Sequence, residues 1–79
     1  MSPTLLRHEG FRYFFFSREE PRAHVHVSGA AGEAKFWLEP AIELAWHSGL
    51  RSDQLSALEA VVTEHNHAFR TAWSQHFGG

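Results

Sequence analysis

Two histidines separated by a single residue, His24 and His26, are the residues of this sequence best suited to chemistry. On a strand, side chains two residues apart project from the same face roughly 6 to 7 Å apart, because the chain rises about 3.3 Å per residue. Two imidazoles at that spacing can converge on one small target, where they could transfer protons, contact a phosphate or bind a metal ion. The alternative is that both are solvated side chains on the polar face of an amphipathic strand.

Cleavage of RNA is the reaction that best fits these histidines together with Lys35 and Glu33. It requires a base to activate the 2′-hydroxyl, an acid to protonate the leaving oxygen and a cation to stabilise the phosphorane. His24 and His26 are the predicted catalytic acid and base. Lys35 is the predicted phosphate contact, and Glu33 is the group expected to orient the histidines. This mechanism uses no metal and no cofactor.

A zinc site is the alternative use of the same histidine pair. Catalytic zinc takes three protein ligands, so His65 is the candidate third ligand and Glu33 could supply a fourth. His65 interrupts an apolar helix stripe between Val62 and Phe69. The commoner explanation for such a residue is a core histidine that hydrogen-bonds a strand carbonyl or Glu39, because an unsatisfied buried polar group costs ~1 to 3 kcal/mol.

The elements that must position these residues are strands. Residues 4–8 and 11–16 flank Glu9-Gly10, which predicts a hairpin whose second strand is apolar on both sides and therefore covered from both. Residues 23–27 and 33–38 flank a glycine-containing link and predict a second hairpin. Alternation there places the valines on a core face and the two histidines, Glu33, Lys35 and Trp37 on the other face.

Two further elements follow the hairpins. Residues 41–46 predict another strand with Ile42, Leu44 and Trp46 on one side, although a short helix is an alternative. From Ser52 to about residue 77, apolar side chains recur at steps of three and four, which predicts one long helix. The expected fold is a single α+β domain over residues 1–79. Its small antiparallel sheet, residues 4–46, consists of two hairpins plus a further strand and packs against a long C-terminal helix, residues 52–77.

Composition excludes several classes of site and protein. The chain has no cysteine, so disulfides, thiolate metal sites and thiol nucleophiles are excluded, and a reducing compartment is expected. The formal net charge of −2 shows no basic excess, although seven histidines can add positive charge on protonation. No apolar run is long enough to span a membrane. The protein is therefore expected to be cytoplasmic.

Several segments together resemble the bacterial domain-of-unknown-function family 4160, over nearly the whole chain. The most specific is His24-Val25-His26-Val27, followed by Gly-Glu-Ala-Lys-Phe-Trp-Leu-Glu-Pro at residues 32–40. The others are residues 10–17 and the C-terminal His65, Phe69, Trp73 and Phe77-Gly78. The family usually has prolines directly before the first histidine, whereas here Arg22 and Ala23 follow Pro21.

The resemblance implies a small cytoplasmic protein encoded beside a second small family of unknown function, number 2442. That arrangement resembles a toxin–antitoxin module in which this chain would be the RNA-directed toxin. The alternative hypotheses are a non-enzymatic module that binds the neighbour-encoded protein, and a histidine-rich zinc domain.

Overall fold

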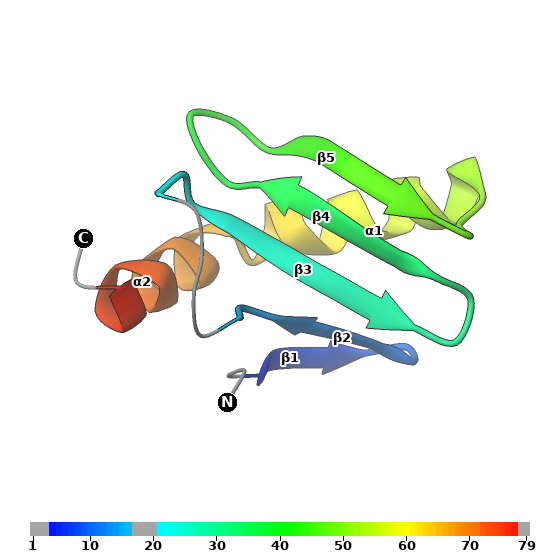
Figure 1. The fold of residues 1–79 in the computed structure, drawn as a ribbon, viewed down its shortest axis with the longest axis horizontal. Coiled ribbons are helices and arrows are strands. Elements are labelled where there is room, and N and C mark those ends of the chain that lie inside the picture. Colours follow the sequence, from blue (N-terminus) through cyan, green and yellow to red (C-terminus); the bar gives the residue numbers. More distant parts are fainter. Residues whose placement is uncertain (1–3, 17–20, 78–79) are drawn as a thin grey trace.

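The computed structural model describes residues 4–16 and 21–77, which form five strands followed by two helices (Figure 1). The strands are β1 (Thr4–His8), β2 (Phe11–Phe14), β3 (His24–Gly29), β4 (Glu33–Trp37) and β5 (Glu43–Ser48). They form one antiparallel sheet whose spatial order is the order of the sequence. Helices α1 (Ser52–Glu64) and α2 (Asn66–Phe77) follow. The predicted α+β fold is confirmed.

Both predicted hairpins are present. Glu9 and Gly10 connect β1 to β2 with φ of 50° and 83°, and positive φ at both central residues is the geometry of a two-residue type I′ turn. At the tip of the β3–β4 hairpin, a Cβ atom added to Gly32 would collide with the carbonyl oxygen of Ser48. Glycine therefore lets this tip approach the end of β5. The loop predicted over residues 17–21 lies outside the described residues except for Pro21.

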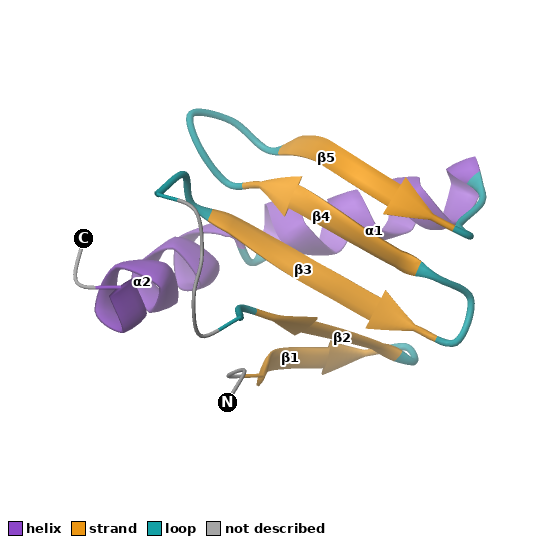
Figure 2. Ribbon diagram, viewed as in Figure 1, coloured by secondary structure: helices purple, strands orange, loops and turns teal. Residues whose placement is uncertain are grey.

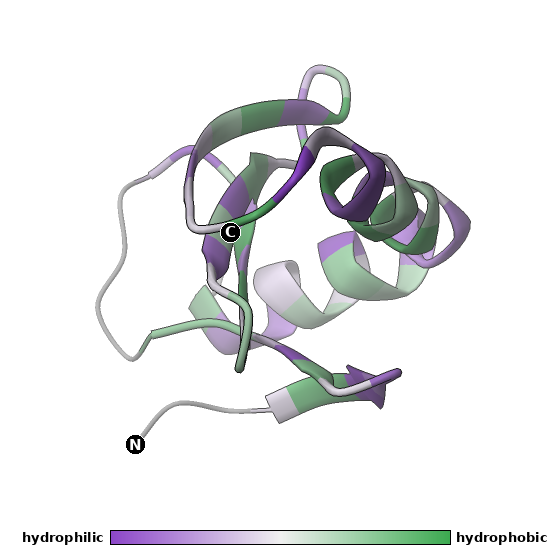
Figure 3. Ribbon diagram, turned by 90° about the vertical axis from the view of Figure 1, so that its right-hand side faces the viewer, coloured by the Kyte–Doolittle hydropathy of each residue, from purple (hydrophilic) through white to green (hydrophobic). Residues whose placement is uncertain are grey.

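The β3–β4 register confirms the predicted division of the two strands into faces. Val25 lies opposite Phe36, and His26 lies opposite Lys35. Both helices lie on one side of the sheet and cover the valine face (Figures 2 and 3), and at the start of β3 Trp73 of α2 also contacts the ring of His24. The core between sheet and helices contains mainly aromatic and branched side chains: Tyr13, Phe15, Val25, Val27, Phe36, Leu38, Leu58, Val62, Phe69 and Trp73.

The helical region differs from the single long helix that the sequence predicts. α1 begins at Ser52 as expected, with Arg51 as the N-cap, and it ends at Glu64. His65 has φ of −100° and ψ of 13°, outside helical geometry, and α2 starts at the next residue. The backbone N–H of His65 still donates to the Val61 carbonyl (3.0 Å), and that of Phe69 donates to the His65 carbonyl (2.9 Å). The apolar stripe therefore continues through a bend instead of along one axis.

No helix formed by the described residues is both long and apolar enough to cross a membrane.

Tyr13 is the core residue with the most unfavourable polar group. Its ring is fully buried and stacks on Phe69, with 6.0 Å between ring centroids. Its hydroxyl has no hydrogen-bond partner among the described residues. Burial, with a smaller contribution from the negative charge of Glu9, raises the pKa of Tyr13 from 10.0 to about 12.

This pKa predicts a loss of stability at alkaline pH. Between pH 10 and about pH 12 an unfolded tyrosine releases its proton while the folded protein keeps it. The unfolded state then binds fewer protons, so the free energy of unfolding falls as pH rises, approaching a loss of about 2 to 3 kcal/mol above the folded pKa. Urea unfolding of the natural protein and of Tyr13→Phe across this range measures the effect. Tyr13→Phe should lack the part of the alkaline stability loss that comes from the tyrosine. At neutral pH this variant should be at least as stable as the natural protein. If the free energy of unfolding fell equally with pH in the two proteins, the raised pKa of Tyr13 would be contradicted.

Candidate functional site

The candidate site is the sheet face that the helices leave uncovered, which we call the open face. Its described side chains include Arg12, Phe14, Phe16, His26, Glu33, Lys35, Trp37 and Trp46, with Arg22 and Glu43 at the margin beside Trp37. The strand register sets four of them side by side across the sheet: Phe14 lies opposite His26, His26 opposite Lys35, and Lys35 opposite Trp46. Each of β2 to β5 therefore contributes one residue to a single row of aromatic and basic side chains.

Cations lie directly on the aromatic rings of the open face. The Arg22 guanidinium lies 4.3 Å from the ring centroid of Trp37, and Lys35 Nζ lies 4.4 Å from it. The Arg12 guanidinium lies 4.3 Å from the ring centroid of Phe14. Each such contact is favourable by ~0.5 to 1 kcal/mol where exposed and by more where water is excluded. The face therefore presents flat rings and positive charge in the same place.

His26 is half-buried among rings. Its ring lies 5.6 Å from Phe14 and 4.3 Å from Phe16, measured between centroids. Together with Glu33, these three residues line a small hollow of about 70 Å³ that Trp46 also borders. Phe16 and Trp46 remain 45% and 46% exposed. Two of the predicted site residues, His26 and Glu33, thus share one hollow, and Lys35 is the cross-strand neighbour of His26.

His24 lies beside His26, as the spacing predicts, but it does not reach the surface. The two rings meet edge to face with 5.0 Å between centroids. His24 is fully buried against Trp37 and Trp73, at 5.5 Å and 4.9 Å. Its Nδ1 carries a proton and donates it to the Arg22 carbonyl (2.7 Å), since a carbonyl can only accept. The catalytic role predicted for His24 stays a prediction, and in this geometry a substrate would meet His26 first.

The zinc site predicted from His24, His26 and His65 is not assembled. The part of the chain that the structure describes contains no group of three histidine or acidic side chains placed to hold a metal ion. His65 lies at the junction of α1 and α2, where Nδ1 donates to the Val61 carbonyl (3.0 Å) and the ring stacks on Phe69. The predicted satisfied histidine is therefore the correct alternative, although its partner is a helix carbonyl and not a strand carbonyl or Glu39.

Two predictions about the faces of strands are wrong. β2 is not covered from both sides by other elements among the described residues, and Phe14 and Phe16 instead belong to the open face. Residues 42, 44 and 46 do not share one side, because the register shifts between Lys35 and Phe36. This shift pairs Trp46 with Lys35 and Leu44 with Phe36, so Trp46 turns to the open face. The spacing of two residues between Arg12, Phe14 and Phe16 could have indicated that they share a face. The register shift in β5 has no comparable signal in the sequence.

Comparison with other proteins identifies a family but no characterised relative. No protein of curated function and no solved structure matches the chain. A family model described as domain of unknown function (DUF4160) matches residues 10–74. This range includes β2 to β5, all of α1, most of α2 and the four residues predicted as catalytic. The chain therefore belongs to DUF4160, the family that its His-Val-His and Gly-Glu-Ala-Lys-Phe-Trp-Leu-Glu-Pro segments indicate.

Proposed function

We propose that the protein is a cytoplasmic RNA-binding protein that holds single-stranded RNA on the open face. The observation that carries this proposal is the row of Phe14, His26, Lys35 and Trp46, flanked by Trp37 with two cations on its ring. Unpaired bases stack on exposed aromatic side chains and on guanidinium planes, while nearby cations contact the phosphates. On this face the exposed rings are those of Phe16 and Trp46, and Arg12 and Arg22 are half-buried cations. Phe14 and Lys35, at 7% and 9% exposed, support these groups from within the row.

The charge of the open face also favours a nucleic acid. The open face has three basic side chains, Arg12, Arg22 and Lys35, and two acidic ones, Glu33 and Glu43. Glu43 forms an ion pair with Arg22 at 3.1 Å. The whole chain has a net charge of −2, so this face is more basic than the rest of the protein. Two or three phosphate contacts would give a modest salt dependence, with a slope of roughly −1.5 to −2 in log affinity against log salt. Stacking would therefore supply much of the affinity.

Trp46 tests the stacking platform because its ring is 46% exposed and its removal should not damage the core. Trp46→Ala should weaken binding of a short single-stranded RNA by about 5- to 100-fold, since stacking of one base contributes ~1 to 3 kcal/mol. Fluorescence anisotropy with a labelled oligouridine measures this change. Leu44→Ala is the matched control, because Leu44 is 39% exposed on the same strand but pairs with Phe36 of the core face. Equal affinities of all three proteins would count against the proposal.

We further propose that the bound RNA is cleaved, in keeping with a toxin of a toxin–antitoxin-like module. His26 would take the proton of the 2′-hydroxyl as the 2′-oxygen bonds to phosphorus, and would return it to the 5′-oxygen as the bond between phosphorus and that oxygen breaks. Glu33 in the same hollow would orient His26, and Lys35 would contact the phosphate. His24, packed edge-on against His26, would act as a positioning residue that does not touch the RNA.

His26→Gln separates cleavage from binding. The variant should lose RNA cleavage and growth inhibition on induced expression, while its affinity for oligouridine changes little because the neighbouring rings remain. Gel analysis of incubated RNA and growth curves are the measurements. His8→Gln, an exposed histidine on β1, is the control and should behave as the natural protein. If the natural protein does not cleave RNA, or if His26→Gln cleaves it equally well, His26 is not catalytic. The proposal would then be limited to RNA binding.

A second candidate function is the binding of a neighbour-encoded small protein of family 2442, the antitoxin in such a module. The observation that favours it is β5, which forms one edge of the sheet and exposes Leu44 on the side away from the open face. An exposed edge strand can accept a strand from a partner, and apolar side chains beside it add affinity.

The two functions use different sides of β5 and can be told apart. Leu44→Lys should weaken the complex with the neighbour-encoded protein at least about tenfold, because a charge would be buried at an apolar contact, while RNA binding is unchanged. Isothermal titration calorimetry with the purified partner measures the complex, and Glu64→Lys, far along the chain on α1, controls for added charge. Undiminished complex formation by Leu44→Lys would exclude this edge as the interface.

A further inference from the structure

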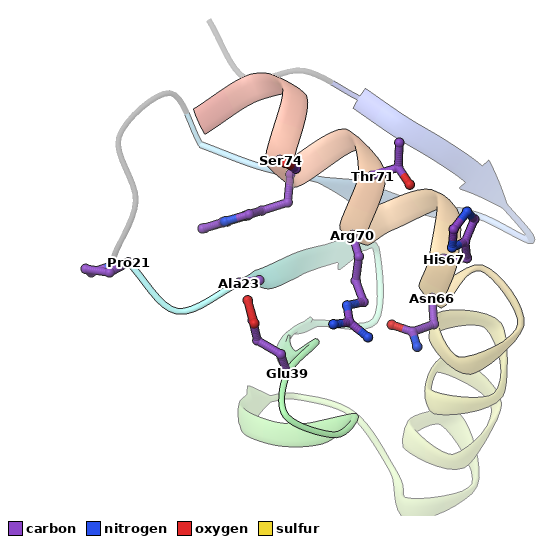
Figure 4. Close-up of a pocket in the computed structure, with 9 residues that line it drawn as sticks. Pro21, Ala23, Glu39, Asn66, His67, Arg70, Thr71 and Ser74 are labelled. Atoms are coloured by element: carbon purple, nitrogen blue, oxygen red, sulfur yellow. The ribbon is translucent and has the colours of Figure 1, made fainter. Parts of the chain in front are cut away.

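A second recess lies at one end of the sheet, between α2 and the segments that precede β3 and follow β4 (Figure 4). Its volume is about 740 Å³, within the roughly 300 to 1,000 Å³ range of sites for small ligands and nucleotides. Pro21 and Ala23 line it on the β3 side, and Glu39 lines it on the β4 side. The α2 wall includes Asn66, Arg70 and the largely buried Trp73.

Opposite charges face this recess without neutralising each other. The Arg70 side chain extends from α2 toward the space between Glu39 and Asn66 (Figure 4). Among the described residues, neither the Glu39 carboxylate nor the Arg70 guanidinium has an ion pair or hydrogen bond. The recess therefore offers an acceptor of two hydrogen bonds and a planar donor to the same ligand.

The recess adjoins the open face through Arg22. The Arg22 Nε donates to the backbone carbonyl of Glu39 (2.8 Å), and its guanidinium lies on the Trp37 ring. On the other side of this boundary, Trp73 lines the recess and contacts the ring of His24 at 4.9 Å. A strand of RNA that passes over Trp37 would therefore reach the mouth of the recess with its next unpaired nucleotide.

We infer that this recess binds an unpaired guanine base of the RNA, an assignment that rests on the proposed RNA-binding function. Guanine has two adjacent N–H donors on its Watson–Crick edge, which match the two oxygens of Glu39. Its O6 and N7 acceptors match the donors of Arg70. Adenine, cytosine and uracil each place an acceptor beside the donor on that edge, so a carboxylate would face a lone pair there.

The test compares a short oligouridine with the same oligomer carrying one central guanosine. The natural protein should bind the guanosine-containing RNA at least about fivefold more tightly, because a good bidentate pair discriminates by ~1 to 3 kcal/mol. Glu39→Gln keeps the size of the side chain but gives one of its two positions a donor; it should lose the preference and keep the affinity for oligouridine. Arg70→Met should also reduce the preference. Glu59→Gln, an exposed acid-to-amide change on α1, is the matched control and should keep it.

The outcomes separate this inference from the function on which it rests. Binding of both RNAs with equal affinity, or an unchanged preference in Glu39→Gln, would overturn the guanine site and leave RNA binding by the open face. Failure of the natural protein to bind either RNA would overturn both. Titration with guanosine monophosphate alone, followed by NMR, tests the site directly. The amide chemical shifts of Asn66 and Arg70 should change. Changes confined to residues of the open face would overturn the site.

Discussion

The register between β3 and β4 is the constraint on which the rest of the structure depends. Pairing Val25 with Phe36 turns one set of side chains toward the helices, and pairing His26 with Lys35 turns the other set away. A slip by one residue would turn Lys35 and His26 toward the helices and the valines away from them, so the apolar face fixes the position of the polar one. The open face is therefore set by the packing of the core and needs no interaction of its own to define it.

Two helices of moderate length can cover only one side of a five-stranded sheet, so the other side must be compatible with water. Here this is achieved by placing cations on aromatic rings: Arg22 and Lys35 flank Trp37, and Arg12 covers Phe14. The long aliphatic stems of the half-buried Arg12 and Arg22 also shield apolar surface, whereas Lys35 is itself buried, with 9% of its surface exposed. Phe16 and Trp46 are only partly shielded, and the uncovered rings are what a flat ligand could contact.

Local sequence patterns predict most of this architecture, because hairpins depend on turn residues and on alternation within a few positions. The first hairpin is predicted by Glu9-Gly10, and the two faces of the second hairpin are predicted by the alternation around His24. The start of the helical region is predicted by the apolar stripe from Ser52. The errors arise where a long-range contact decides. The shift in β5 depends on its pairing with β4, and the burial of His24 depends on Trp73 some fifty residues later. The bend at His65 interrupts an apolar stripe that is itself continuous in the sequence. Of the predicted site, alternation placed His26, Glu33, Lys35 and Trp37 on one face, but the prediction did not include the rings of Phe14, Phe16 and Trp46.

The meander order of the strands has a consequence for how the chain folds. Every strand pairs with its neighbours in the sequence, so the sheet can grow one hairpin at a time with short loops to close. The contacts of α1 and α2 with the sheet region, such as Phe15 with Trp73, join distant parts of the chain. Docking of α2 against Tyr13 and Phe15 closes the largest of these loops and therefore completes the cooperative unit.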